Sequence, residues 1–285
     1  MSNTAVENVY TRHRARELAQ RHFWPLLGMF FIAVGIPYLL TWAGTTLLAL
    51  TNNQVLTGIG RFLLDMVYTL ISSSLMLGIT TAQLELCRGA VYCPVTSVFS
   101  RMRDCRKAFG LSLWVSLKLV LWALPVYAVI RIGAHILIPV AMESRIPLEV
   151  AEPILTILPF LALVLVLGLV IPAALRYMLS NYILADDPEC SVFSCVNMSK
   201  ALMAGHKWQL AKLTLPLFLV MLVMALVVAV VFGAIISLLG LKAASPLLSL
   251  LLSLLMYLAI AYYSIRMQLC TALFYLKRIG DKKSA

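Results

Sequence analysis

The chain has 285 residues, of which 62% are apolar, with a mean hydropathy of +0.94 and a formal net charge of +11. Soluble domains are about 45–50% apolar. The excess here lies in uncharged stretches longer than the ~20 residues that cross a bilayer, which excludes a soluble two-domain protein. The positive charge lies in short segments beside those stretches, so it indicates anionic lipid headgroups and membrane topology and argues against nucleic acid as a partner.

Six apolar stretches are predicted to be transmembrane helices. In chain order they run at about 23–50, 58–86, 109–140, 153–184, 208–239 and 246–276. The first stretch follows a polar segment with four arginines and is too long for the apolar core of a cleavable signal peptide, so we expect it to be retained. The sequence therefore predicts an all-α membrane protein with six transmembrane helices.

Basic residues mark one side of the predicted membrane protein. Most lysines and arginines flank one set of helix ends, together with both termini, whereas only Arg61, Arg145 and Lys242 flank the other set. Positively charged loops remain in the cytoplasm. We therefore expect cytoplasmic N- and C-termini.

Three short segments resemble one another, at residues 8–11, 97–100 and 191–194. Pro94 and Pro188 each stand four residues before the valine of the second and third segment. Each segment precedes a pair of apolar stretches. Because two spans per unit preserve orientation, the pattern predicts three parallel hairpin repeats in one membrane domain, at about 1–90, 91–185 and 186–285.

Each predicted hairpin is preceded by a predicted amphipathic cytoplasmic helix that lies at the membrane interface. In the third unit Asp187 is the expected N-cap, with Pro188 in the first turn. One apolar face is expected at Val192, Cys195, Val196, Ser199 and Leu202 or Met203. The matching face of the second unit is expected at Val95, Val98, Phe99 and Met102.

A few ionisable residues lie inside the outer parts of the predicted spans. Asp65 is expected to pair with Arg61, one turn earlier, and the alternative is part of an ion or proton path. Arg131 is expected to reach the interface, and the alternative is an outer polar cavity shared with His135, Arg61 and Asp65. Lys118 lies deeper and faces either a cavity or the cytoplasmic interface.

Arg176 and Arg266 occupy similar places in the second helices of the second and third hairpins. We interpret them as candidates for binding a phosphate or an anionic lipid headgroup, together with Lys200 and Lys207 on the basic face. The alternative is that the two arginines reach the interface or cap neighbouring carbonyl groups.

No sequence pattern indicates catalysis, a metal site or a cofactor. The four histidines have no ligand spacing, and neither a metalloprotease motif, a nucleophile elbow nor a phosphate-binding loop is present. The six cysteines are expected to be packed free thiols, since the predicted topology places them near the reducing cytoplasmic side. A redox or metal role for them is the less favoured alternative.

Residues 175–188, LRYMLSNYILADDP, and 199–208, SKALMAGHKW, carry a family resemblance. The chain resembles the bacterial membrane family called domain of unknown function 975, a distant relative of the membrane domain of glycerophosphoryl diester phosphodiesterases. The resemblance implies a multi-pass protein of the bacterial cytoplasmic (inner) membrane with no established catalytic residues. The chain departs from the family where Ala173, in place of a frequent glycine, follows Pro172.

Three functions are consistent with these features. We favour a non-catalytic membrane module that organises anionic lipid or a membrane protein partner through its basic cytoplasmic face. The alternative is a small transporter or lipid-translocating protein with a cavity on the pseudo-threefold axis. An enzyme is the least favoured of the three.

Overall fold

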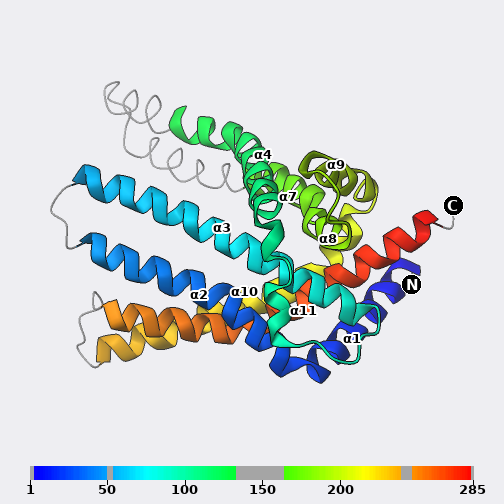
Figure 1. The fold of residues 1–285 in the computed structure, drawn as a ribbon, viewed down its shortest axis with the longest axis horizontal. Coiled ribbons are helices and arrows are strands. Elements are labelled where there is room, and N and C mark those ends of the chain that lie inside the picture. Colours follow the sequence, from blue (N-terminus) through cyan, green and yellow to red (C-terminus); the bar gives the residue numbers. More distant parts are fainter. Residues whose placement is uncertain (1–2, 50–53, 133–163, 239–245, 284–285) are drawn as a thin grey trace, which may run out of the picture.

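The computed structural model describes residues 3–49, 54–132, 164–238 and 246–283. All regular elements in these ranges are helical (Figure 1). The first half contains α1 (Asn3–Arg21), α2 (Phe23–Ala49), α3 (Gln54–Cys87), η1 (Val95–Phe99), η2 (Met102–Asp104) and α4 (Cys105–Ile132). The second half contains η4 (Val166–Val170), α7 (Ile171–Tyr177), α8 (Ser180–Asp186), α9 (Val192–Leu202), α10 (Lys207–Leu238) and α11 (Pro246–Lys283).

Five helical stretches within the described ranges are long and apolar enough to cross a membrane. They are Phe23–Leu48, Thr57–Cys87, Val95–Ala128, Gly168–Asp186 and Lys207–Ala234. α11 is not among these five, although it has 38 residues and residues 246–265 carry no charge. The helices agree with a multi-pass membrane protein.

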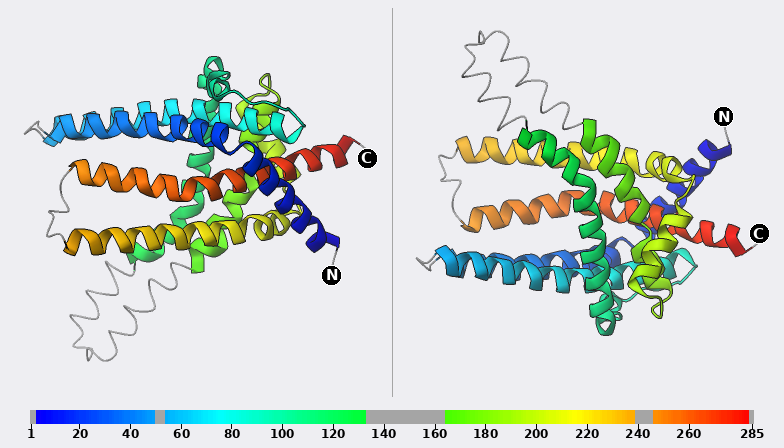
Figure 2. Two further views of the ribbon diagram at one scale, coloured as in Figure 1. Left: turned by 90° about the horizontal axis from the view of Figure 1, so that it is seen from below. Right: turned by 90° about the horizontal axis from the view of Figure 1, so that it is seen from above.

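Two helical hairpins lie side by side, α2 with α3 and α10 with α11, while α4 and α7 run at an angle to them (Figure 1, Figure 2). Both termini lie at one end of the molecule (Figure 1). We call this end the basic end; it is formed by α1, η1, η2, α8, α9 and the last turns of α11. The parts of the two hairpins farthest from it are called the apolar half.

The tightly packed core lies toward the basic end. Its fully buried large side chains come from all parts of the chain: Leu26, Met29, Leu75, Leu84, Leu86, Leu111, Leu179, Leu184, Met203, Leu210, Leu213 and Tyr275. In the apolar half many of the described large side chains are exposed, including Leu47, Phe62, Leu226 and Val230. Soluble proteins rarely expose so many large apolar side chains together, and this surface is suited to lipid.

Glycine shapes the junction between the first two predicted units. α3 ends where Gly89 adopts a φ of +105°, and the Ala90 N–H donates to Glu85 O at 3.0 Å. This left-handed residue with its returning hydrogen bond is a common way to end a helix. The chain thereby reverses into the segment that carries η1.

η1 approaches α3 so closely that only glycine fits between them. A Cβ atom on Gly78 would lie 2.0 Å from Val98 O and 2.7 Å from Val98 C. Val98 itself is fully buried. Because the clashing atoms belong to the backbone, a larger residue at position 78 would force the two segments apart.

The amphipathic helix predicted for the second unit is not one continuous helix. Residues 95–104 form two short 3₁₀-helices, and Phe99 and Met102 are exposed where a shared apolar face was expected. The tight contact with Gly78 provides the physical reason, since the backbone of Val98 is packed against α3. A 3₁₀ segment rotates successive side chains differently from an α-helix, so Val98 is buried while Phe99 and Met102 are not.

On the face predicted for the third unit, Cys195, Val196, Ser199 and Met203 are buried in or at the end of α9, and Val192 is partly buried. The predicted N-cap is wrong by one turn. Ser191 caps the helix by accepting from the Ser194 N–H, while the Asp187 carboxylate accepts from the Glu189 N–H at 3.1 Å and closes a turn before the helix.

The fourth predicted span is divided into short pieces in its described part. A π-helical turn, η4, leads into α7, and Pro172 lies in the first turn of α7. Proline has no N–H to donate, which accounts for the irregular turn before it. The break directs α7 and α8 toward α3 and α4, where they complete a cavity.

Candidate functional site

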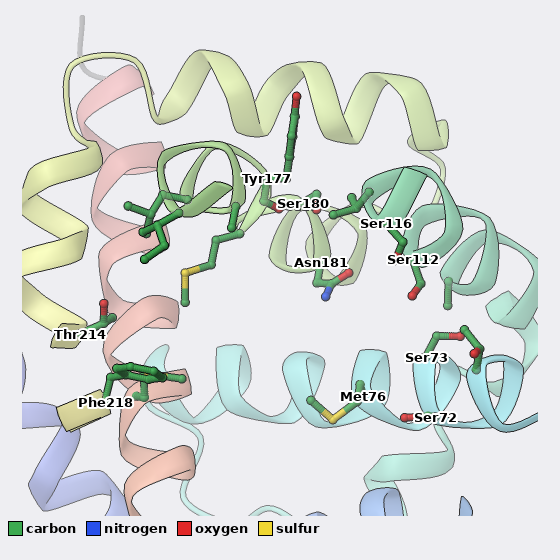
Figure 3. Close-up of a pocket in the computed structure, with 18 of the residues that line it drawn as sticks. Ser72, Ser73, Met76, Ser112, Ser116, Tyr177, Ser180, Asn181, Thr214 and Phe218 are labelled. Carbon is green, nitrogen blue, oxygen red and sulfur yellow. Dashed lines mark hydrogen bonds between the residues drawn. The ribbon is translucent and has the colours of Figure 1, made fainter. Parts of the chain in front are cut away.

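A cavity of about 750 Å³ lies between α3, α4, α7, α8, α10 and α11 (Figure 3). Its walls therefore come from all three predicted units. On α3 the wall includes Ser72, which stands at the middle of the span-like stretch Thr57–Cys87. The cavity has the size of a site for a small molecule, for which about 300–1,000 Å³ is typical.

The cavity wall combines apolar side chains with hydroxyl groups. The polar members are Tyr68, Thr69, Ser72, Ser73, Ser112, Ser116, Tyr177, Ser180, Asn181 and Thr214. Four of these groups are already used, since each donates to a carbonyl oxygen three or four residues back: Thr69, Ser73, Ser180 and Thr214.

Other polar groups on the wall have no partner within the described ranges. The side chains of Ser72, Ser112, Ser116 and Asn181 make no hydrogen bond there. Figure 3 shows Asn181 on α8 facing α3 across the cavity, with Ser112 and Ser116 on α4 beside it. The space between these helices thus holds an amide and several hydroxyls that are available to a ligand.

No lysine, arginine, aspartate or glutamate among the described residues lines this cavity. Asp65 lies one turn beyond Thr69 on α3, outside the cavity, and is exposed. Lys118, Arg131 and Arg176 are also absent from the wall. The described part of the cavity wall is therefore uncharged, and the ionisable residues singled out from the sequence do not contribute to it.

Lys118 and Arg176 instead lie at the interface between α4 and α7. The Lys118 Nζ is 5.2 Å from the centre of the Trp114 ring and 5.7 Å from that of Tyr177. The Arg176 Cζ is 5.4 Å from the centre of the Trp122 ring. Two cations thus stack on aromatic rings one turn apart on the same pair of helices.

These two cations have no acidic partner in the part of the chain that the structure describes. The Nε of Arg176 is buried and makes no hydrogen bond there. The backbone oxygen of the same residue accepts from Ser199 Oγ at 2.8 Å, which ties α7 to α9. The positive charge at this interface is therefore uncompensated by the chain's described acids.

The other predicted ionisable residues are not brought together. Arg266 stacks on Tyr262 of its own helix at 5.5 Å, and its Nε is also buried without a partner among described residues. Arg131 is exposed and stacks on Tyr127 at 5.7 Å. His135 lies outside the described residues. The predicted shared outer cavity is thus not seen in the described part of the chain.

Arg61 and Asp65 are both described, and they do not form the expected ion pair. Both side chains are exposed on α3. One helical turn of separation permits contact but does not enforce it, and exposed pairs of this kind gain little free energy.

Several basic residues at the basic end have structural partners. Arg88 pairs with Asp186, whose other carboxylate oxygen accepts from the Tyr275 hydroxyl at 3.1 Å. Lys107 donates to Pro188 O at 2.6 Å. These bonds connect the end of α3 and the start of α4 to the end of α8, and α8 to α11, so these charged groups stabilise the fold.

A second polar group joins α1 to the last hairpin. Glu7 accepts from Lys277 at 2.5 Å and from the Gln209 side chain at 3.0 Å. The side chain of Gln209 in turn accepts from Arg278. The N-terminal helix is thereby fixed across α10 and α11.

Lys200 and Lys207, the remaining predicted headgroup residues, lie on α9 and at the first position of α10. Lys200 is exposed, and Lys207 is partly exposed. Neither forms an ion pair with a described residue. Both are placed to meet solvent or headgroups at the basic end.

The six cysteines are free thiols in the structure. Burial raises the pKa of Cys195 to about 12 and also raises the pKa of Cys93. A buried thiol with a raised pKa is a poor nucleophile and a poor metal ligand. Among the described residues no group of histidine, cysteine and acidic side chains is arranged to hold a metal ion.

The cavity wall was not identified from the sequence, although a signal for it exists. Thr69, Ser72, Ser73 and Met76 follow one another at helical spacing on α3, and Ser112 and Ser116 stand one turn apart on α4. Small hydroxyl residues on one helix face also occur at ordinary packing contacts. Sequence alone therefore does not separate a cavity wall from a close helix contact.

A family model described as "Protein of unknown function (DUF975)" matches residues 10–280. The chain therefore belongs to this family. No curated protein and no solved structure matches the chain.

Proposed function

We propose that this protein is a non-catalytic membrane module that binds and organises anionic lipid through its positively charged side chains. The observation that carries the proposal is the pair Lys118 and Arg176 between α4 and α7. A charged group within a membrane protein is costly unless a counter-charge accompanies it. Since the described acids do not supply one, a lipid phosphate is the partner that the bilayer itself offers.

The proposed topology places this pair in the inner membrane of a bacterium. It consists of six spans, α11 included, in three parallel hairpin units with both termini in the cytoplasm. Support comes from the shared position of the termini and from Trp24 and Trp208, which are 77% and 75% exposed at the starts of α2 and α10. Tryptophans are enriched at membrane interfaces. The resemblance at 175–188 also supports a distant relation to the membrane domain of glycerophosphoryl diester phosphodiesterases.

The exposed basic residues of the basic end extend the proposed lipid contact. Lys200, Lys207 and Lys212 lie on or beside α9 and at the start of α10, with no acidic partner among described residues. Each basic residue near an anionic surface contributes about 1 kcal/mol. A membrane protein partner docking on this face is compatible with the same charges.

Native mass spectrometry tests the headgroup site. The protein is purified from vesicles of phosphatidylglycerol and phosphatidylcholine, beside the double variant Lys118→Met with Arg176→Gln. We expect the native chain to retain phosphatidylglycerol preferentially and the double variant to lose this preference. Arg131→Gln is the matched control, since Arg131 also stacks on a ring but is exposed. Equal retention of both lipids, or retention unchanged in the double variant, contradicts the proposal.

The cavity favours a second candidate function, a small transporter or lipid-translocating protein. Its support is that all three predicted units contribute to one uncharged cavity that reaches the middle of α3. Transbilayer movement of a fluorescent phospholipid in vesicles tests it. Movement faster than in protein-free vesicles supports this function, and an unchanged rate contradicts it.

A further inference from the structure

We propose that the cavity is a binding site for an uncharged amphiphile, a molecule with an apolar body and a head that carries hydroxyl or carbonyl groups, drawn from the bilayer. The inference concerns binding alone. It depends neither on the headgroup site at Lys118 and Arg176 nor on whether the protein moves its ligand.

The first argument is the absence of charge on the described wall. A phosphate or carboxylate in an apolar site needs a basic side chain or several N–H donors, and the described wall contains no basic residue. A ligand with an ammonium head would need a carboxylate partner, and the described wall contains no aspartate or glutamate. Lys118 does not line the cavity, and its ammonium group stacks on the rings of Trp114 and Tyr177. The chemistry of the wall therefore selects against both signs of charge.

The second argument is the unused hydrogen-bonding capacity. The amide of Asn181 offers two N–H donors and one acceptor, and the hydroxyls of Ser72, Ser112 and Ser116 each offer a donor and acceptors. None of these side chains has a hydrogen-bond partner within the described ranges. Asn181 and Ser116 are exposed, so their polar groups are open to a ligand and are not packed against other protein groups. Hydroxyl or carbonyl groups of a ligand would supply the missing hydrogen-bond partners.

The third argument is the apolar remainder of the wall. Met76, Met178 and Met267 line the cavity together with Leu175, Leu215 and Phe218. Methionine is flexible and polarisable, so it adapts to ligands of varied shape. Asn181 lies on α8 and Phe218 on α10 (Figure 3). If the head of a ligand forms a hydrogen bond with Asn181, its apolar tail can pack against the apolar side chains of the same cavity.

The test uses a monoacylglycerol that carries a photoreactive diazirine on its acyl chain, with the whole protein in phosphatidylcholine nanodiscs. We expect labelling of peptides that contain residues 171–181 and 211–218. Unlabelled monoolein is expected to compete, whereas oleoyl lysophosphatidate, with the same tail and a charged head, and octadecane, with no head, compete at least about tenfold less well. A tenfold difference corresponds to about one hydrogen bond in an apolar site.

Two variants link the labelling to the cavity. Asn181→Leu removes the free amide and is expected to weaken competition by monoolein about tenfold. Ser116→Trp adds a large side chain at an exposed position on the cavity wall and is expected to reduce labelling itself. Thr45→Leu is the matched control on α2, where the hydroxyl bonds to Trp42 O and does not line the cavity.

Each outcome tests a different part of the proposal: the site, the class of ligand or the independence of the two sites. Labelling that maps to the cavity, prefers monoolein and falls in both variants but not in Thr45→Leu supports the site. Equal or better competition by oleoyl lysophosphatidate overturns the uncharged class. Labels confined to the apolar half, or labelling unchanged in folded Ser116→Trp, overturn the site itself. Loss of the lipid preference in Lys118→Met with Arg176→Gln, with this labelling intact, shows that the two sites are independent.

Discussion

The basic end and the apolar half are built from the same long helices but are held together differently. At the basic end α11 forms polar contacts with α3, through the 2.7 Å bond between the side chains of Gln83 and Gln268, and with α8, through the bond of Tyr275 to Asp186. In the apolar half the same helices, with α2 and α10, present large exposed apolar side chains. The contrast indicates that protein contacts define the structure at one end, whereas the other end depends on lipid.

This contrast has a physical origin. Apolar side chains gain little from leaving lipid for another helix, because lipid tails are as apolar as leucine. Close backbone contact and interhelical hydrogen bonds still contribute in a membrane. The specific packing of the helices therefore depends on contacts such as those made at Gly78, Asp186 and Gln268. Substitutions at the two ends should consequently differ in their effects.

The largest effect is expected for Gly78→Ala. The added Cβ would lie 2.0 Å from a backbone oxygen, so η1 must separate from α3, and we expect a loss of at least about 3 kcal/mol in the free energy of unfolding. Unfolding in mixed dodecylmaltoside and SDS micelles measures it. Gly233→Ala, where nothing lies within 4 Å of the added Cβ, should change stability by less than about 1 kcal/mol. Similar losses in both variants would contradict the close contact.

A pair of leucines on α10 compares the two regions directly. Leu213 is 1% exposed and Leu226 is 64% exposed. Leu213→Ala should lose about 2–5 kcal/mol because it leaves a space in packed protein. Leu226→Ala should remain within about 0.5 kcal/mol, since detergent surrounds the side chain before and after unfolding. The same micelle titration checks both, and a large loss for Leu226→Ala would show that its surroundings are protein.

The ion pair at the basic end should give an intermediate effect. Asp186→Asn removes the charge partner of Arg88 and weakens the acceptor of Tyr275, so we expect a loss of about 1.5–3 kcal/mol. Tyr275→Phe removes one bond and should lose about 1 kcal/mol. Thermal unfolding in dodecylmaltoside measures the loss of stability in each variant. If the two losses add in the double variant, Asp186 and Tyr275 are not coupled as the structure indicates.

The smallest effect on stability is expected for Cys195, whose reactivity reports how tightly α9 is packed. Burial raises the pKa of Cys195 from 9.0 to about 12, so very little thiolate exists at pH 8. A water-soluble maleimide should label Cys195 slowly until SDS is added, and faster labelling in the folded protein would contradict its burial.

Because the pKa of Cys195 is raised in the folded protein, this thiol contributes stability that is complete below pH 9 and is lost as pH rises toward 12. Cys195→Ser should remove that dependence.

Much of the architecture follows from the sequence alone. The membrane-protein class, the boundaries of α2, α3 and α10 and the buried face of α9 depend on local composition and helical periodicity, which a sequence displays directly. The family follows from residues 175–188 and 199–208, and the family match over residues 10–280 confirms it.

Only the tertiary structure decided where side chains meet. Ser112 on α4 and Asn181 on α8 face one cavity because Pro172 and the π-helical turn before it redirect the fourth stretch. The segment at 95–104 becomes 3₁₀ rather than α because it packs on Gly78, and Lys118 stacks on the Tyr177 ring without lining the cavity itself. Each outcome depends on contacts between residues far apart in the chain, and periodicity along one helix contains no information about the neighbour that its face will meet.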